Sequence, residues 1–174
     1  MKERYVKEIQ STDEHIDELS QLLITVVDQG ASIGFLPPLS LSDAKQYWDS
    51  VLSPGVILYV AVFEGRIAGT IQLHLCMKQN GRHRAEVAKL MTHPDSRRNG
   101  IARTLLEKVE ERAIHEGRTL LVLDTREGDP SNLLYRSMNY QQVGRIPYFA
   151  ATAEGELQTT VLYYKVLPQA LPDT

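Results

Sequence analysis

The residues best suited to chemistry lie in one short stretch, 97–102, which reads Arg-Arg-Asn-Gly-Ile-Ala. A strand-like run at 87–91 precedes it, and apolar residues at helical spacing follow it. A small-residue loop that opens a helix leaves backbone N–H groups without partners, and the helix dipole makes that end positive. Arginine guanidinium groups can bind two phosphate oxygens at once. The stretch therefore predicts an anion site that holds a diphosphate-bearing cofactor.

This stretch lies within an alternation of strands and helices. Apolar spacing and turn signals predict strands at 5–9, 56–63, 67–75, 85–92, 120–124, 141–146 and 159–165. Helices are predicted from Asp13 to near Gly30, after a cap at Ser40 or Ser42, over 100–116, and over 131–138 after a cap at Asp129. We expect one mixed α and β domain over residues 1–167, followed by a loose tail at 168–174.

Composition and charge limit the class of protein. The 174 residues are 43% hydrophobic and 24% charged, as in an ordinary soluble domain. A net charge of -3 argues against nucleic acid as a partner. The charged N-terminus predicts no signal peptide, and no apolar run is long enough to predict a membrane span. Cys76 has no partner for an internal disulfide, and the five histidines show no ligand spacing, so we expect a cytoplasmic protein without a metal.

The pattern Arg97-x-x-Gly100-x-Ala102 resembles the acetyl-CoA signature of the GNAT N-acetyltransferases, which is Q/R-x-x-G-x-G/A. It follows a strand that ends at His93-Pro94, and it opens a helix. That context makes a short motif much more specific than its letters alone. The resemblance implies that acetyl-CoA is a co-substrate.

Two later elements extend the resemblance. The strand at 121–124 and the short helix that carries Asn132 and Tyr135 match the next elements of the superfamily, so the likeness covers about residue 56 to the end. It implies an α/β (α+β) fold with a single GNAT domain. In that fold a central mixed, mostly antiparallel sheet is splayed between two strands and flanked by helices.

Four local stretches, 30–35, 80–91, 123–125 and 150–155, resemble the tabtoxin-resistance acetyltransferases more closely. Those enzymes acetylate an amine of a β-lactam amino-acid toxin, which implies toxin resistance and a small amine acceptor here. Asn99 stands where many members have glycine. Asparagine tolerates positive φ better than other non-glycine residues, so the loop can still form.

The resemblance also implies where the cofactor binds. The backbone near residues 90–92 would pair with the pantetheine arm as an added strand, and one N–H there would polarise the acetyl carbonyl. The loop and the first turn of the following helix would hold the diphosphate. The predicted cofactor contacts are Leu90, Met91, Thr92, Arg97, Arg98, Asn99, Gly100, Ile101, Ala102, Arg103, Thr104 and Asn132.

Acetyl transfer needs a neutral amine, and an amine of pKa about 10.4 is neutral in only about one molecule in 2,500 at pH 7. Glu86 and Asp124 are the candidate bases, because strand ends at the splay face the acceptor in this superfamily. An ordinary glutamate is too weak a base for direct abstraction and needs a raised pKa or a relayed water. Both carboxylates could instead bind and orient the ammonium group, or form a strand-end salt bridge.

Tyr135 matches the tyrosine that the superfamily often uses as a general acid toward the thiolate. Full transfer from a phenol near pKa 10 to a thiolate near 8.5 runs uphill by about 2 kcal/mol, so a hydrogen bond to sulfur could suffice. Its place on an amphipathic helix also allows a purely packing role. We expect Ser32, Phe35 and Tyr148 to line the acceptor pocket, although each could equally be loop packing.

The main prediction is an N-acetyltransferase that moves the acetyl group of acetyl-CoA directly to a primary amine of a small molecule. Acetylation of a protein N-terminus or lysine is the alternative within the same chemistry, although the apolar loop at 30–38 is better suited to covering a small pocket. A non-catalytic acetyl-CoA sensor is the alternative from another class. The sequence leaves a monomer and a homodimer equally open.

Overall fold

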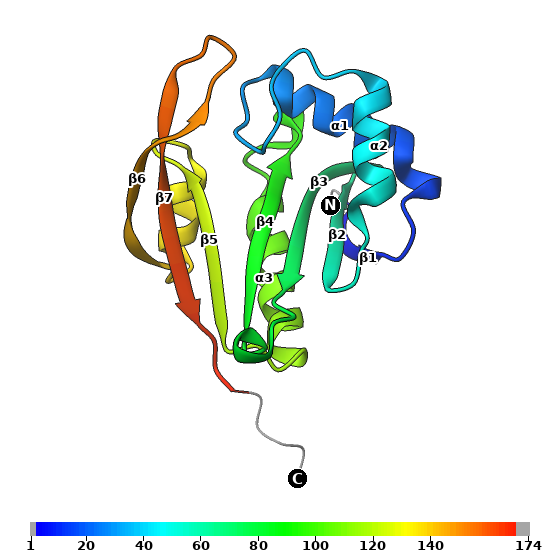
Figure 1. Cartoon of the computed structure of the whole chain (residues 1–174). Helices are drawn as coiled ribbons and strands as arrows, with labels where there is room; N and C mark the ends of the chain where they lie inside the picture. The colour runs from blue at the N-terminus through cyan, green and yellow to red at the C-terminus, as the bar shows by residue number, and fades with distance from the viewer. Residues whose placement is uncertain (1–2, 170–174) are drawn as a thin grey trace.

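The computed structural model describes residues 3–169, and a seven-stranded sheet runs through its centre (Figure 1). Neighbouring strands follow the order β1-β2-β3-β4-β5-β7-β6, and every neighbouring pair is antiparallel except β4 and β5. The predicted mixed, mostly antiparallel sheet is therefore confirmed. The strands are β1 (Arg4–Ile9), β2 (Val56–Phe63), β3 (Arg66–Leu75), β4 (Arg84–Thr92), β5 (Leu120–Arg126), β6 (Gln141–Ala151) and β7 (Leu157–Val166).

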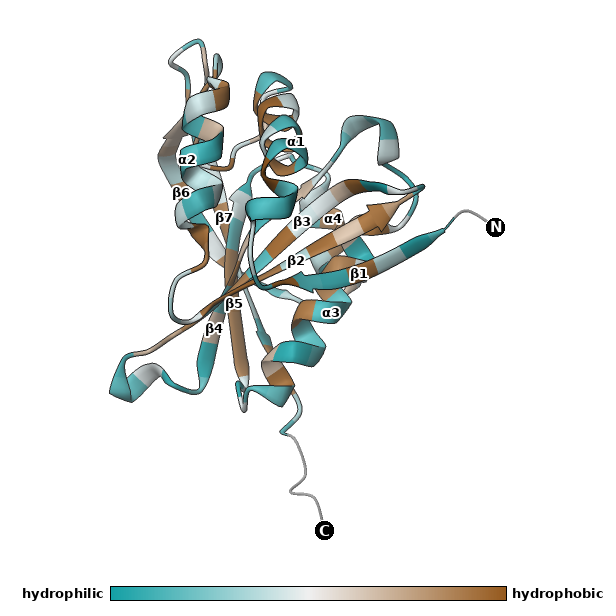
Figure 2. Ribbon diagram, turned by 90° about the vertical axis from the view of Figure 1, so that its right-hand side faces the viewer, coloured by the Kyte–Doolittle hydropathy of each residue, from teal (hydrophilic) through white to brown (hydrophobic). Residues whose placement is uncertain are grey.

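Helices cover both faces of this sheet (Figures 1 and 2). The α-helices are α1 (Ile16–Asp28), α2 (Leu41–Val51), α3 (Ile101–His115) and α4 (Ser131–Ser137). Three short 3-10 turns lie at Asp13–His15, Gln79–Gly81 and Pro94–Ser96. The helices α1 and α2 pack with one buried cluster, and α3 and α4 pack with the other.

The strand β2 shows why the sheet is buried on both sides. Its residues are nearly all apolar, as expected for a strand with helices on both faces. Because side chains alternate along a strand, successive residues enter different cores. Ile57, Tyr59 and Ala61 join the α3 core, whereas Leu58, Val60 and Val62 join the α1–α2 core.

The helix ends agree with those predicted from the sequence, with two exceptions. Ser40 caps α2 through its Oγ, which accepts the Asp43 N–H at 3.0 Å. Gly100 and Gly117 flank α3 as expected, both with φ near +70°. Asp129 does not cap α4, because its carboxylate pairs with Arg126 at 2.9 Å and Pro130 takes the cap position.

The second exception concerns the loop before α3. Positive φ was predicted for Asn99, but it occurs on either side, at Arg98 (+64°) and Gly100 (+72°). The Asn99 amide instead donates to the carbonyls of Ser96 and Arg97, both at 3.1 Å. These two hydrogen bonds of Asn99 stabilise the loop.

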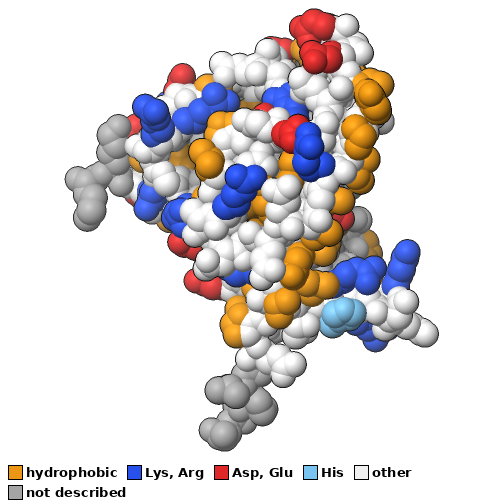
Figure 3. Space-filling model, turned by 90° about the vertical axis from the view of Figure 1, so that its left-hand side faces the viewer, with side chains coloured by type: hydrophobic (Ala, Val, Ile, Leu, Met, Phe, Trp, Pro, Cys, Tyr) orange, Lys and Arg blue, Asp and Glu red, His pale blue; other side chains and the backbone are white. Residues whose placement is uncertain are grey.

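The edge strand β6 runs beyond its predicted end at Ile146, because pairing with β7 resumes after an irregularity between Ile146 and Ala150. Figure 3 views the molecule from this side, where hydrophobic side chains stand on the surface among charged ones. The exposed hydrophobic residues of β6 include Val143, Tyr148 and Phe149. In the predicted tail, residues 170–174 lie outside the described residues. No helix within 3–169 is long and apolar enough to cross a membrane.

Candidate active site

A cleft opens where β4 and β5 separate. The two parallel strands pair only from Arg84 and Leu120 to Glu86 and Val122, although β4 continues to Thr92. A β-bulge lies just beyond this point: Thr70 pairs with Met91 and Gln72 pairs with Ala88, which puts two β4 residues opposite one β3 residue. The space beside this unpaired part of β4 is a cleft of about 1190 Å³.

Most residues predicted from the sequence line this cleft. They come from β4, β5, the start of α3, α4 and the segment after α1. They are Ser32, Glu86, Leu90, Met91, Thr92, Arg97, Arg98, Gly100, Ile101, Ala102, Arg103, Asp124 and Tyr135. The remaining five lie elsewhere: Phe35, Asn99, Thr104, Asn132 and Tyr148.

The start of α3 gives one end of the cleft a positive character. The helix has no side-chain cap, and its first backbone bond runs from the Thr104 N–H to the Gly100 carbonyl at 3.0 Å. The three preceding N–H groups, from Ile101 to Arg103, therefore have no acceptor within the helix. With the arginines at 97, 98 and 103 in the same lining, this end can hold an anion.

Thr104 and Arg103 also have contacts that the sequence did not predict. The Thr104 hydroxyl donates to the Gly100 carbonyl at 2.9 Å, so it faces back into the turn and does not line the cleft. Arg103 lines the cleft, but its Nη2 donates to the Ser137 hydroxyl at 2.6 Å. This bond ties the first turn of α3 to the end of α4.

Asn132 is buried, and both ends of its amide are used inside the protein. Its Nδ2 donates to the carbonyls of Arg126 and Asp129, each at 2.9 Å, and its Oδ1 accepts the Tyr163 hydroxyl at 2.8 Å. Asn132 does not line the cleft, and its predicted contact with the cofactor stays a prediction. Asn132 fastens α4 to the end of β5 and to β7, and so positions Tyr135.

Substituting Asn132 by alanine should destabilise the fold. The change leaves the buried Tyr163 hydroxyl without its acceptor and removes the donor to two carbonyls, a cost of about 3 kcal/mol. For a domain of this size we expect the Tm to fall by roughly 8 °C. Leu133→Ala is the control, because Leu133 lies on the same helix and is 71% exposed. Equal melting temperatures for the two variants would contradict the positioning role.

The two candidate carboxylates stand on the same face of the sheet. In β4, Ala85 and Val87 enter the α3 core and Glu86 is exposed between them. In β5, Leu121 and Leu123 enter that core, and the exposed Asp124 lies two residues beyond the last pair with β4. The Asp124 Oδ2 accepts the Thr160 hydroxyl at 2.7 Å. Both carboxylates thus line the cleft at the splay.

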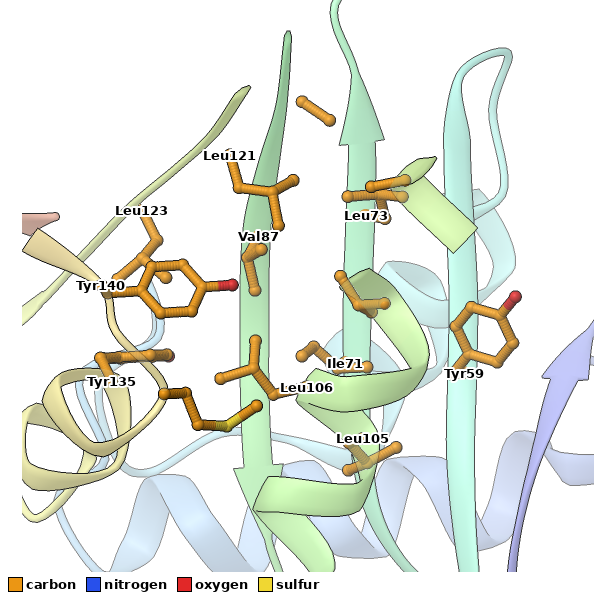
Figure 4. Packing of buried hydrophobic residues seen from close by; sticks show 14 of the residues in the cluster. Tyr59, Ile71, Leu73, Val87, Leu105, Leu106, Leu121, Leu123, Tyr135 and Tyr140 are labelled. Atoms are coloured by element: carbon orange, nitrogen blue, oxygen red, sulfur yellow. The ribbon is translucent and has the colours of Figure 1, made fainter. Parts of the chain in front are cut away.

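Tyr135 reaches the cleft from the opposite side, on α4. Its ring packs against Tyr140 and Tyr163, with ring centroids 5.6 and 5.8 Å away, and only 4% of the residue is exposed (Figure 4). No hydrogen bond joins its hydroxyl to another of the residues 3–169. Burial, with a smaller contribution from the Asp124 charge, raises the pKa of Tyr135 well above that of an ordinary tyrosine. The phenol therefore stays protonated throughout the physiological range.

Lys89 is a cation on the β4 bulge, and it lines the cleft beside the carboxylates. Its Nζ donates to the Ile33 carbonyl at 2.5 Å and lies 5.7 Å from the centre of the Phe35 ring. Burial lowers the pKa of Lys89, while the charges of Asp124 and Glu86 act in the other direction. It joins the segment after α1 to the splay.

Residues 19–140 match the acetyltransferase (GNAT) family. The chain belongs to this family. Members of the GNAT family transfer an acetyl group from acetyl-CoA to an amine, and the splayed pair β4 and β5 is the part of the fold that the resemblance predicted. In residues 3–169 there is no cluster of three or more His, Cys, Asp or Glu side chains that could hold a metal ion.

Individual relatives agree with this membership. The chain is 37% identical over 105 residues to an uncharacterized N-acetyltransferase encoded in the hisH–hisA intergenic region of Azospirillum brasilense; the match spans 58% of this chain and 62% of that relative. The fold is similar to a GNAT-family acetyltransferase of Streptococcus pneumoniae, with a TM-score of 0.79, 20% identity, and 95% of this GNAT chain and 100% of the other covered. It is also similar to a Salmonella typhimurium protein solved with its cofactor acetyl-CoA, with a TM-score of 0.78, 16% identity and 98% of each chain covered.

Two of the residues predicted to line the acceptor pocket, Phe35 and Tyr148, are not part of the cleft lining. Phe35 lies behind Lys89 and packs edge-on against Tyr47, with ring centroids 5.1 Å apart, so it supports the pocket from outside the lining. Tyr148 is 76% exposed and is not part of the lining, whereas its neighbour Phe149 is. Both Tyr148 and Phe149 lie within the irregularity of β6 between Ile146 and Ala150, which was not visible in the sequence.

The cleft of this GNAT domain is also lined by three residues that were not predicted, Lys89, Gln158 and Thr160. A signal for Lys89 existed. Strict alternation after Ala85 and Val87 assigns residue 89 to the core, where an unpaired lysine is rare. A lysine at such a position indicates a bulge. For Gln158 and Thr160 the pairing of β7 with β5 had to be known first.

Proposed function

We propose that this GNAT chain transfers the acetyl group of acetyl-CoA to a primary amine of a small molecule. The proposal rests on one observation, which is that two parts of the same cleft carry opposite charge. The uncapped, arginine-rich start of α3 lies at one end, and the carboxylates of Glu86 and Asp124 lie at the splay. An anion-binding end and an ammonium-binding end are what this reaction requires.

The cofactor side uses backbone groups more than side chains. The diphosphate would accept the N–H groups of residues 101–103, with Arg97 and Arg98 adding charge-assisted contacts. The open edge of β4 at Leu90 to Thr92 would pair with the pantetheine arm in the manner of an added strand. An N–H on the same edge would stabilise the charge that develops on the acetyl oxygen.

On the acceptor side, Glu86 and Asp124 attract the ammonium group, which must first lose a proton, either to one of these carboxylates or to water. The amine nitrogen then bonds to the acetyl carbon, the carbon–sulfur bond breaks, and the sulfur leaves with the bonding electrons. The nitrogen gives up a second proton as the amide forms, and the thiolate can take it. Tyr135 donates a hydrogen bond to that sulfur. Because burial raises the pKa of Tyr135, complete proton transfer to the thiolate is less favourable than for an ordinary phenol, which favours the hydrogen bond.

The small size of the acceptor is supported by the segment after α1. Ser32 to Gly34 line the cleft, and the bond from Lys89 to the Ile33 carbonyl holds that segment against β4. An acceptor site with this segment in its wall suits a small amine better than a protein chain. A narrower proposal, from the resemblance of four local stretches, is an amino-acid-like toxin as acceptor and toxin resistance as the biological role.

A screen for release of free CoA tests the activity. Acetyl-CoA is mixed with the protein and with amines of three kinds: β-lactam amino acids, aminoglycosides and peptides. We expect release with small amino-acid-like amines, together with the N-acetylated product by mass spectrometry. Release with peptides alone would contradict the small acceptor, and no amine-dependent release with any of them would contradict the transferase activity.

Separate substitutions Asp124→Asn and Glu86→Gln distinguish a base from an orienting carboxylate. If the carboxylate removes the proton, kcat should fall by about 100-fold or more and the acidic limb of the pH profile should disappear. If it only binds the ammonium group, the KM for the amine should rise while kcat is kept. Both variants keep a side-chain oxygen, so the amide that replaces the Asp124 carboxylate can still accept the Thr160 hydroxyl. Unchanged kcat and KM in both variants would show that neither carboxylate takes part in amine binding or in catalysis.

A further inference from the structure

Lys89 is a cation in the cleft that the acetyl transfer proposed above does not use. The Lys89 Nζ donates a hydrogen bond to the Ile33 carbonyl, and it lies over the apolar ring of Phe35. An ammonium group has three N–H donors, so the contact with Ile33 leaves donors that can bind a ligand. No carboxylate within the described part of the chain forms a salt bridge with it.

The bulge in β4 determines which way the Lys89 side chain points. Its φ is +54°, an unusual value for a residue with a side chain, and the bulge turns it away from the α3 core that alternation would assign to it. The side chain is half-buried, and a half-buried cation without an ion pair carries a desolvation cost. A bound anion would offset that cost.

The charges around Lys89 define what would fit. Glu86 and Asp124 line the same cleft and are close enough to act on the Lys89 ammonium, yet neither pairs with it. A ligand with both a cationic and an anionic group would complement this arrangement. Its ammonium group would lie toward the carboxylates, and its anion would take the spare donors of Lys89.

Gln158 supplies a second unfilled contact in the same lining. Its Oε1 is buried, and it has no hydrogen-bond partner in the described part of the molecule. A buried amide oxygen in this position is costly unless a donor reaches it. An acceptor with an ammonium group brings such a donor.

Resting on the acetyl transfer proposed above, we propose that Lys89 binds an anionic group of the acceptor, and that the acceptor is a zwitterion with the chemistry of an α-amino acid. Lys89 thereby determines specificity for acceptors that carry an anionic group. Its contact with the Ile33 carbonyl holds the segment after α1 in the wall of the same cleft.

Matched acceptor pairs test this assignment. Glycine and each L-amino acid that has a primary amine and no side-chain carboxylate are compared with their carboxamides, which keep the amine and lack the anion. For the pairs that are acetylated, the wild-type protein should show a kcat/KM at least tenfold higher for the acid, as expected for a charge-assisted hydrogen bond. Lys89→Gln should abolish that preference by lowering kcat/KM for the acid while keeping it for the amide. Lys89→Arg should retain most of it.

Lys108→Gln is the control, because Lys108 lies on the surface of α3 and pairs with Glu111. Melting curves check that each variant is folded. A wild-type preference for the amides, or an equal loss for acid and amide in Lys89→Gln, would overturn the assignment of Lys89 while leaving acetyl transfer intact. A protein that acetylates no amine of either series overturns the zwitterionic acceptor, and if the wider amine screen also fails, the proposed function fails with it.

Discussion

Replacing Gly100 by aspartate should abolish acetyl-CoA binding. Gly100 occupies the cap position of α3, where three free N–H groups and the helix dipole would meet the diphosphate. A fixed carboxylate there repels each phosphate charge by about 3 kcal/mol at about 5 Å and an effective dielectric constant near 20. The dissociation constant should rise by roughly 100-fold or more.

The fold should survive this change. Aspartate is a good helix cap and tolerates positive φ better than most residues, and a Cβ at position 100 would meet only the flexible end of Arg4, at 2.9 Å. Gly100→Asn is the matched control, since it adds nearly the same volume without the charge. Isothermal titration calorimetry should therefore detect acetyl-CoA binding in the asparagine variant and none in the aspartate variant. Equal affinity in wild type and Gly100→Asp would show that the diphosphate binds elsewhere.

Tyr135→Phe should lower kcat on the order of 100-fold with little change in acetyl-CoA affinity. Its hydroxyl bonds to no other side chain or backbone group within 3–169, so its removal breaks no internal bond and the fold should be unaffected. The lost interaction is the hydrogen bond to the departing sulfur. Because its pKa is raised, wild-type Tyr135 should remain protonated above pH 10, and it should contribute no alkaline limb to the pH profile of kcat.

Tyr140→Phe is the control for this prediction. Tyr140 packs against Tyr135 in the same buried cluster but does not line the cleft. Its substitution should leave kcat close to that of the wild type. Full activity in Tyr135→Phe would rule out the hydrogen bond to sulfur and leave Tyr135 as a packing residue.

The sequence was most informative where local rules decide the structure. The loop before α3 needs glycine at positive φ, an arginine cluster and an apolar helix behind it, and each of these is visible within twenty residues. Strand pairing is a long-range property, yet the family resemblance implied a mixed, mostly antiparallel sheet that is splayed between two strands. Glu86 and Asp124 could therefore be predicted to line the cleft before the structure was known.

The errors have one physical origin, which is a local deviation that long-range pairing imposes. The bulge in β4 reverses the faces of the residues that follow and brings Lys89 into the cleft. In β6, the irregularity between Ile146 and Ala150 contains both the exposed Tyr148 and Phe149, which lines the cleft. The hydrogen bond between Asn132 and Tyr163 could not be predicted, because the two residues are 31 positions apart and no local pattern reveals it.

The most direct test follows the acetyl group itself. The wild-type protein is incubated in a single turnover with acetyl-CoA labelled in the acetyl group and with an amine identified in the screen. The account predicts that the label appears on the nitrogen of the acceptor as an amide, with one equivalent of free CoA, and that Gly100→Asp forms none. Label that stays on the thioester, or that leaves as acetate at the same rate with and without the amine, would contradict it.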